Sequence, residues 1–354
     1  MEGPLWTERH QPDIADLPQE GVRENLRRAV QEPMNLVVHG PKGAGKTAAV
    51  RALARETHEN QNDLIELNIA DFFNRTKREI REDPRFESFL EGETEFSKQY
   101  RSGSKENRYK REWSKRDMVS HILKEMAGYP PSSGEYKTLL LDNAEEIRED
   151  FQQALRRVME QYYEATQFVI ATRQPSALIP PIRSRCFPVP VRAPAQAEVV
   201  EVLGSITEAE GVDSDEDGLA YVAEAAEGDL RRAVLNTQTT HEQEGAVTMQ
   251  AAYETLQSVG VDERVGEMLA AAEAGEFTDA RSTLDDLLVD EGYSGGEVLE
   301  DVLTVARSRY GETKLARLHR LAGGVDMDLH EGTNDRLHVS HLLAEIGELA
   351  DGRE

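Results

Sequence analysis

The chain has 354 residues, of which 38% are hydrophobic, and 67 acidic residues against 41 basic ones give a formal net charge of −26. This length exceeds what one hydrophobic core usually supports, so we expect two or three domains, and the composition excludes a disordered chain. The single cysteine, Cys186, excludes an internal disulfide, and no apolar run approaches the roughly 20 residues that cross a bilayer. Without a signal-peptide pattern, we expect a cytoplasmic protein that has no membrane partner.

The acidic balance allows two interpretations. A basic surface is the usual footprint of nucleic-acid binding, so one interpretation is that no nucleic acid binds. The other is a protein of a salt-rich cell, where repulsion between carboxylates is screened within about 3 Å at 1 M salt. We favour the second because the acidic residues are spread over the whole chain rather than gathered in one tail.

The predicted elements begin with an alternation of short apolar runs and helical patterns, which is typical of a parallel α/β sheet. The predicted strands are residues 36–38, 64–67, 138–141, 168–171 and 187–191. Apolar residues at helical spacing predict one helix through Met118 and Met126 and another from Phe151 to Tyr162. From about Pro194 onward only helical patterns remain, with a break near Gly260.

A long hydrophilic segment, 75–116, separates the second and third predicted strands. Its later part, 98–116, is basic with interleaved aromatic rings: Lys98, Tyr100, Arg101, Lys105, Arg108, Tyr109, Lys110, Arg111, Trp113, Lys115 and Arg116. Cationic and aromatic side chains together suit unpaired nucleic-acid bases. A solvated insertion without a fixed partner explains the composition equally well, so both alternatives stay open.

A nucleotide-binding motif follows the first predicted strand and opens a helical pattern. It matches G-x-x-x-x-G-K-[ST] in full: Gly40-Pro41-Lys42-Gly43-Ala44-Gly45-Lys46-Thr47. Glycines let backbone N–H groups turn toward phosphates, and the helix N-terminus favours negative charge. We expect Lys46 to reach the β- and γ-phosphates of ATP and the Thr47 hydroxyl to hold Mg²⁺. A glycine-rich turn without a ligand is the alternative.

A second element supports the same site. The third predicted strand ends in Asp142, whose carboxylate is placed to contact the Mg²⁺ shell. An aspartate at a strand end is also a common cap, so Asp142 alone is moderate evidence for a nucleotide site. Together with the phosphate loop it is strong evidence. Together the two motifs predict ATP and Mg²⁺ as cofactors.

Further motifs occur in the segments Glu8-Arg9-His10-Gln11-Pro12, Leu64-Ile65-Glu66-Leu67-Asn68, Ala154-Leu155-Arg156-Arg157-Val158-Met159-Glu160, Ile179-Pro180-Pro181-Ile182-Arg183-Ser184-Arg185-Cys186, Gly228-Asp229-Leu230-Arg231-Arg232-Ala233 and Glu331-Gly332-Thr333-Asn334. Together they resemble the small subunit of archaeal replication factor C, the clamp loader of DNA replication. The Ser-Arg-Cys box is the most specific of them.

The resemblance implies a fold and partners. The fold is an AAA+ P-loop NTPase core over 1–192, with the charged insertion at about 75–116, then a small helical lid (193–259) and a helical collar for oligomerisation (260–354). The implied partners are other large and small clamp-loader subunits in a hetero-oligomeric ring, the sliding clamp and primer–template DNA, held through its backbone. Four basic residues resemble by position the start of a DNA-contacting helix: Arg75, Lys77, Arg78 and Arg81.

In the family that the chain resembles, the region near the helix through Met118 touches the clamp. Apolar residues at this spacing are typical of any packed helix, so we expect a core stripe rather than an interface. The stripe consists of Met118, Val119, Ile122, Leu123 and Met126.

The resemblance also assigns roles to two arginines. Arg185 is expected to act in trans as an arginine finger on a neighbouring subunit's ATP, an effect worth about 10³–10⁵ in rate elsewhere. Arg231 is expected to touch the γ-phosphate of the chain's own nucleotide. The alternatives are an ordinary surface arginine and a helix salt-bridge partner, respectively. We expect Cys186 to pack rather than react.

The chain departs from the family at the catalytic positions. The family's Asp-Glu-Ala-Asp reads Asp142-Asn143-Ala144-Glu145 here, so Asn143 stands where the water-polarising glutamate belongs. An amide orients water but takes up no proton. Arg173 stands at the family's sensor asparagine and joins the expected nucleotide contacts, and Gln11 replaces an arginine.

These departures predict a second, divergent type of small subunit, and the acidic composition predicts a halophilic archaeon as its source. We expect it to bind ATP and hydrolyse it slowly or not at all, while Arg185 serves its neighbour. Glu145, two residues further along, is expected to point elsewhere. A self-sufficient AAA+ motor, a helicase or remodeller, is the alternative, but a motor needs efficient hydrolysis. A third possibility is a regulatory ring member whose nucleotide only holds its shape.

Overall fold

The computed structural model describes residues 5–69, 72, 75–84, 86, 115–258, 261–290, 293–331 and 334–350. These residues form two compact units, Met1–Ala252 and Tyr253–Glu354, each considered by itself below. The basic segment 98–116 lies outside the described residues up to position 114, as do Gly332 and Thr333 of the last family segment. Within the described part of the chain, no helix combines the length and apolar character needed to cross a membrane.

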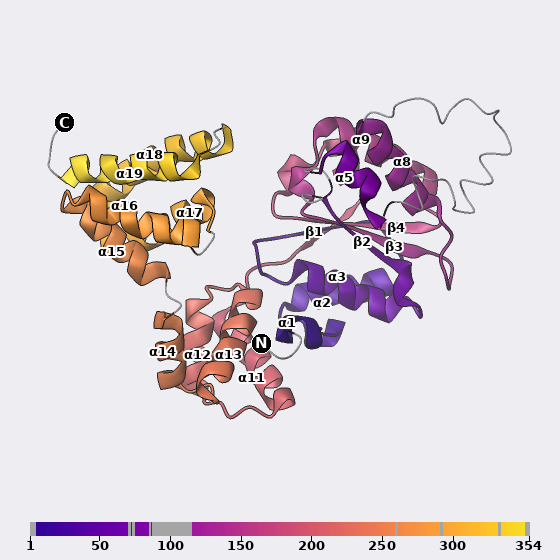
Figure 1. Cartoon of the computed structure of the whole chain (residues 1–354). Coiled ribbons are helices and arrows are strands. Elements are labelled where there is room, and N and C mark those ends of the chain that lie inside the picture. The colour runs from indigo at the N-terminus through magenta and orange to yellow at the C-terminus, as the bar shows by residue number, and fades with distance from the viewer. Residues whose placement is uncertain are drawn as a thin grey trace. The chain divides into compact units, whose positions relative to one another are not determined.

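The first unit is built on one five-stranded parallel sheet (Figure 1). Its order is β2-β3-β4-β1-β5, so the first strand lies between the last two. All five strands lie where the apolar runs predict them, and their bounds differ from the prediction by no more than two residues. They are β1 (Leu36–His39), β2 (Leu64–Asn68), β3 (Lys137–Asp142), β4 (Thr166–Thr172) and β5 (Phe187–Pro190).

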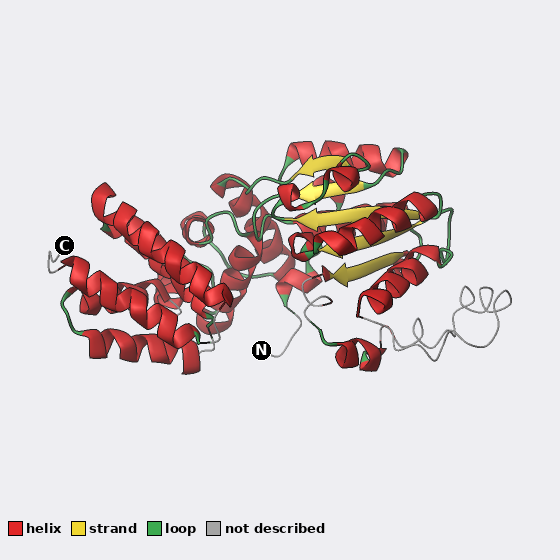
Figure 2. Cartoon of the chain, turned by 90° about the horizontal axis from the view of Figure 1, so that it is seen from above, coloured by secondary structure: helices red, strands yellow, loops and turns green. Residues whose placement is uncertain are grey.

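Helices cover both faces of this sheet (Figures 1 and 2). One face packs on α2 (Glu20–Gln31) and α3 (Lys46–Thr57), and the other on α8 (Lys115–Gly128) and α9 (Glu149–Tyr162). Side chains of β3 alternate between the two cores, because successive strand residues point to opposite faces. This two-sided burial explains why the strands appear in the sequence as unbroken apolar runs. The predicted α/β class is therefore confirmed.

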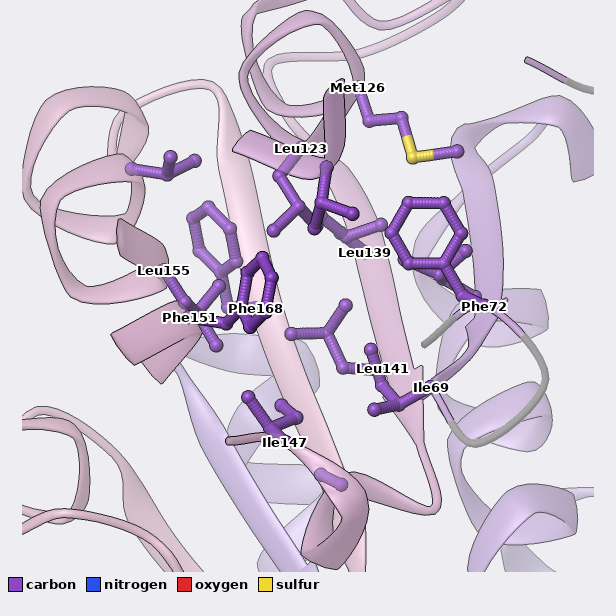
Figure 3. Packing of buried hydrophobic residues seen from close by; sticks show 14 of the residues in the cluster. Ile69, Phe72, Leu123, Met126, Leu139, Leu141, Ile147, Phe151, Leu155 and Phe168 are labelled. Carbon is purple, nitrogen blue, oxygen red and sulfur yellow. The ribbon is translucent and has the colours of Figure 1, made fainter. Parts of the chain in front are cut away.

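The core between the sheet and α8–α9 is shown in Figure 3, where Leu139, Leu141 and Phe168 of the sheet lie among helix side chains. The stripe on α8 belongs to this core, since its five apolar side chains are at most 5% exposed. The prediction that this stripe is core rather than interface is confirmed.

Short helices connect these layers, and longer ones follow the sheet. The short ones are α1 (Trp6–Arg9), η1 (Ile14–Asp16), η2 (Gln61–Asp63), α5 (Lys77–Glu82), η3 (Ala144–Glu146), η4 (Pro175–Ala177) and α10 (Pro180–Arg183). The longer ones are α11 (Gln196–Glu210), α12 (Glu216–Ala225), α13 (Leu230–Glu244) and α14 (Met249–Ser258). The N-terminal segment is tied to these later helices, because Trp6 N donates to Gln238 Oε1 at 2.9 Å and Arg9 pairs with Glu210 at 2.6 Å.

Among its described residues, the second unit consists of helices joined by short connections, and it has its own apolar core, in which Met268, Leu284, Val302 and Leu342 are fully buried. Its elements are α15 (Val261–Glu273), α16 (Phe277–Asp285), the π-helical turn η5 (Asp286–Asp290), α17 (Gly295–Arg309), α18 (Glu312–Glu331) and α19 (Asp335–Ala350). The division of the chain into three domains at 192 and 259 stays a prediction.

Candidate nucleotide-binding site

The strand order brings three predicted site segments to one edge of the sheet. Strands β3, β4 and β1 are neighbours and parallel, so the segments that follow them meet at their carboxyl ends. Ligands of open parallel sheets bind at this edge, where the strand order reverses. The phosphate loop follows β1, Asn143 follows β3, and Arg173 follows β4.

The phosphate loop requires glycine at two positions for steric reasons. A Cβ atom on Gly40 would lie 1.8 Å from the carbonyl oxygen of Val191. Gly43 has a φ of +70°, and a Cβ there would lie 2.0 Å from the carboxyl carbon of Asp229. The loop then opens α3, whose first N–H groups form an anion site of the kind that binds phosphate. The motif therefore has the backbone shape that its sequence predicts.

Lys46 lies folded over its own loop. Its Nζ donates to the carbonyl oxygens of Gly40 at 2.9 Å and Pro41 at 2.6 Å. Burial lowers the pKa of this lysine, and the nearby charges of Asp142 and Glu145 oppose that effect. A bound phosphate would offer Nζ acceptors in place of these two carbonyl oxygens.

Thr47 and Asp142, the two predicted Mg²⁺ ligands, are in contact in the structure. The Thr47 hydroxyl donates to Asp142 Oδ2 at 2.8 Å, which joins the start of α3 to the end of β3. Among the described residues, no group of three or more histidine, cysteine, aspartate or glutamate side chains is placed to hold a metal. Mg²⁺ at nucleotide sites uses one or two protein oxygens and completes its shell with phosphate and water. The two oxygen ligands present here fit Mg²⁺ with ATP.

Asn143 has a left-handed backbone conformation, with φ 54° and ψ 45°. Asparagine is several-fold enriched in this region, which most other side chains avoid. Its side-chain nitrogen donates to Asn68 Oδ1 at 3.3 Å, so the amide bridges the ends of β3 and β2. The position expected to carry a catalytic glutamate therefore holds a neutral amide that is bound to a second amide.

Glu145 is engaged by the end of β4. Its carboxylate accepts hydrogen bonds from the Thr172 hydroxyl at 2.8 Å and from Arg173 N at 3.1 Å and Nε at 2.7 Å. The side chain is only 6% exposed. Burial raises the pKa of Glu145, but these hydrogen bonds outweigh burial and bring it below its usual range. Its partner Arg173 stays half exposed. The carboxylate is thus engaged by the end of β4, and the expectation that Glu145 does not replace the missing base stays a prediction.

The start of α13 lies against the phosphate loop. Leu230 N donates to Gly43 O at 3.0 Å, and Asp229 caps the helix by accepting from Arg232 N at 2.9 Å. Arg231 is exposed one residue beyond this contact. The predicted lid segment is thus in direct contact with the loop that it is expected to close, and the role of Arg231 toward the γ-phosphate stays a prediction.

Arg185 lies on the surface between α10 and β5. Its Nη1 donates to Pro181 O at 2.6 Å, and its Nη2 lies 2.7 Å from Glu160 Oε1. The neighbouring Cys186 is half-buried against the sheet core, and burial raises its pKa to about 12. A thiol with that pKa is protonated and unreactive at neutral pH, in agreement with a packing role.

Three contacts of the site were absent from the sequence predictions. Gln19, which is 4% exposed, donates to the carbonyl oxygens of Ala44 at 3.1 Å and Arg192 at 2.9 Å and so fixes the phosphate loop. The others are the pairs that Glu145 and Glu160 form with arginines. A single sequence gives no sign of such partners, because they lie far from these three residues along the chain or on another element.

Two families match the chain. Residues 36–191 match the ATPase family associated with various cellular activities (AAA), and residues 262–345 match the replication factor C C-terminal domain. The replication factor C small subunit of Aeropyrum pernix is 32% identical over 356 residues, which cover 96% of this chain and 94% of that protein. Its counterpart in Natronomonas pharaonis is 29% identical over 349 residues, covering 97% and 94%.

Solved structures support the fold. The RuvB Holliday junction branch migration motor of Thermotoga maritima matches with a TM-score of 0.52 and 16% identity, over 78% of this chain and 87% of that one. At this identity the likeness shows the fold alone. The full-length similarity to the small subunits, and the two matching families, show that the chain belongs to the replication factor C small subunit family.

Proposed function

We propose that this chain is an ATP-binding small subunit of a clamp loader, working in a ring with other large and small subunits. The assembly would place a sliding clamp on primed DNA in the cytoplasm. The observation that carries the nucleotide part is the contact between the Thr47 hydroxyl and the Asp142 carboxylate, beside a complete phosphate loop. Family membership supports the clamp-loader part.

The chain's own nucleotide would be held by residues of three segments. Backbone N–H groups of the loop, from Gly40 to Thr47, would bind the phosphates, with Lys46 on the β- and γ-phosphates. Arg173 is held beside Lys46 by Glu145 and would add a second positive charge. Arg231 would approach from α13. Mg²⁺, held by Thr47 and Asp142, would neutralise developing charge on the phosphates.

Hydrolysis at this site would be slow or absent. Asn143 offers an amide where a carboxylate is needed to take up a proton. The nearby carboxylate of Glu145 is occupied by three hydrogen bonds, so it is not available as a base. Arg185 would instead act in trans, because it lies on the surface and carries a positive charge that stabilises the transition state of phosphoryl transfer.

The DNA contacts of this subunit are proposed only for basic residues near the insertion. Within the described part, Arg75 pairs with Asp83, and Arg78 lies 2.9 Å from Glu82, at α5. Phosphate binding there would compete with these acidic neighbours, so the basic segment 98–116 is the stronger candidate. Deleting residues 98–116 would weaken DNA-dependent loading if this segment holds DNA.

The test is ATP turnover and clamp loading by the reconstituted complex, with Arg185→Ala or Lys46→Ala in this subunit. We expect a collapse of turnover with Arg185→Ala, by about 10³-fold or more at the neighbouring site. Lys46→Ala should cause only a mild loss, since little turnover occurs at this chain's own site. Equal and large losses from both variants would contradict slow hydrolysis. Unchanged turnover with Arg185→Ala would favour a regulatory ring member instead.

A further inference from the structure

The Arg185 guanidinium is held at two points although it lies on the surface. Its Nη1 donates to Pro181 O, and its Nη2 is 2.7 Å from Glu160 Oε1 on α9. The exposed fractions are 39% for Arg185 and 41% for Glu160, so water reaches both. A free arginine at such exposure would sample many rotamers. The two contacts instead select one orientation.

The backbone beside Arg185 is also fixed. Ile182 is fully buried, and Cys186 packs against the core between the sheet and α9. Arg185 N donates to Ile182 O at 3.0 Å. Since α9 carries Glu160 and packs on the same core, the carboxylate and the guanidinium are attached to segments that share one packed core.

Of the two described arginines near the Glu160 carboxylate, Arg185 lies closer than Arg156. Arg156, one turn earlier on α9, lies 4.0 Å from the same oxygen, which is beyond hydrogen-bond distance. A guanidinium has five N–H donors, so one that is held at two of its nitrogens still offers donors to a phosphate.

We propose that Glu160 is a positioning residue, which holds the Arg185 guanidinium in the orientation that meets a neighbouring subunit's nucleotide. This inference rests on the proposed role of Arg185 in trans. A catalytic group that is held in the reactive geometry speeds the reaction, and a misplacement of about 1 Å is enough to slow it about 10²-fold. Glu160 itself touches neither nucleotide nor reacting atoms, so its effect runs entirely through Arg185.

The experiment compares Glu160→Ala, Arg185→Ala and the double variant in the reconstituted complex. An exposed pair constrains its partners weakly, so Glu160→Ala should lower kcat about two- to fivefold. KM for ATP should stay unchanged, because the loss concerns the transition state and not ground-state binding. In the Arg185→Ala background, Glu160→Ala should have no further effect. Glu160→Gln, which keeps an acceptor without the charge, should fall between wild type and Glu160→Ala.

The matched control is Glu164→Ala, which removes another exposed carboxylate just beyond the end of α9 and should leave kcat unchanged. A wild-type or higher kcat in Glu160→Ala, with Arg185→Ala still inactive, would overturn the positioning role alone. The same loss in both backgrounds would also overturn it, because the effect would not run through Arg185. If Arg185→Ala itself kept full turnover, the role in trans would fail, and the positioning role with it.

Discussion

At the scale of single residues, the backbone at position 143 suits the residue that replaces the family's glutamate. Asn143 has φ 54°, and a glutamate in the left-handed region is disfavoured by about 1–2 kcal/mol. The amide also holds Asn68 across the ends of two strands. Asparagine therefore suits this turn better than glutamate, in agreement with the proposal that the site binds ATP and hydrolyses it slowly.

Asn143→Glu should restore part of the missing chemistry. A positioned general base contributes about 10²–10⁴-fold, so we expect at least about a tenfold rise in turnover at this site, even with imperfect geometry. The free energy of unfolding should fall by about 1–2 kcal/mol, from backbone strain and the lost Asn68 contact. The rise in turnover is measured by single-turnover hydrolysis in the Arg185→Ala background, in which the neighbouring site is inactive. The fall in the free energy of unfolding is measured by urea unfolding.

Asn143→Gln controls for side-chain length without adding a carboxylate. It should be as strained as the glutamate variant but as slow as wild type. A rise of the same size in both variants, or in neither, would contradict the view that the absent carboxylate limits hydrolysis.

Parts of this site follow from the sequence and parts do not. The phosphate loop has a fixed spacing, and the meeting of Thr47 with Asp142 follows from placing two parallel strands near one another. The engagement of Glu145 by Arg173 joins residues 28 positions apart and depends on which strands are adjacent. A single sequence carries no such information, because the order β2-β3-β4-β1-β5 has no local signal.

At the scale of elements, β3 begins with a buried cation. Lys137 is 1% exposed, and its Nζ donates to the carbonyl oxygen of Tyr129 just after α8. Burial lowers its pKa to about 8, against the opposing charge of Asp63. Asp63 itself is 1% exposed and accepts from Ser133 N and Oγ at 2.9 and 2.8 Å. The first residue of the strand therefore ties the helix end to the sheet through an ionisable group.

This lysine predicts a pH dependence of stability. In the folded chain Lys137 loses its proton near pH 8, whereas in the unfolded chain it keeps it to about pH 10.4. Between these values the unfolded state binds more protons, so the contribution of Lys137 to stability rises with pH, by at most about 1.4 kcal/mol per pH unit. Wild type should gain stability relative to Lys137→Met as the pH is raised through this window.

Urea unfolding of both chains over this window measures the difference. Loss of the hydrogen bond to Tyr129 lowers the free energy of unfolding of Lys137→Met by an amount that does not depend on pH. The change of the stability difference with pH therefore reports the ionisation of Lys137. Parallel curves for the two chains would mean that Lys137 stays protonated when folded. The start of a strand gives no hint of such burial in the sequence, since lysine usually lies on the surface. The short helices η3 and α10 could not be predicted from the sequence either, because three or four residues show no periodicity.

At the scale of the whole molecule, each of the two units has apolar cores of its own, while the excess of acidic residues is found in both. The sequence predicts this much, because a strand-rich first part and a helical second part need different packing. It does not predict that helices α11–α13 belong to the same compact unit as the sheet, since contacts such as Trp6 with Gln238 join residues 232 positions apart. Long-range pairs of this kind arise only once the chain is folded.

The net charge of −26 gives the last prediction. Like charges repel in the compact state, and the screening length falls from about 10 Å at 0.1 M salt to about 3 Å at 1 M. Salt also weakens exposed pairs such as Arg51 with Glu66, but such pairs contribute at most about 1 kcal/mol each. The relief of repulsion among the surplus carboxylates should outweigh that loss, so the midpoint of thermal unfolding should rise by about 5 °C or more between 0.1 and 2 M KCl.

Sucrose at matched osmolality is the control, because it stabilises compact states without screening charge. A flat or falling midpoint in KCl, or an equal rise in sucrose, would remove the physical basis for placing this subunit in a salt-rich cell, and the acidic surface would then need another explanation.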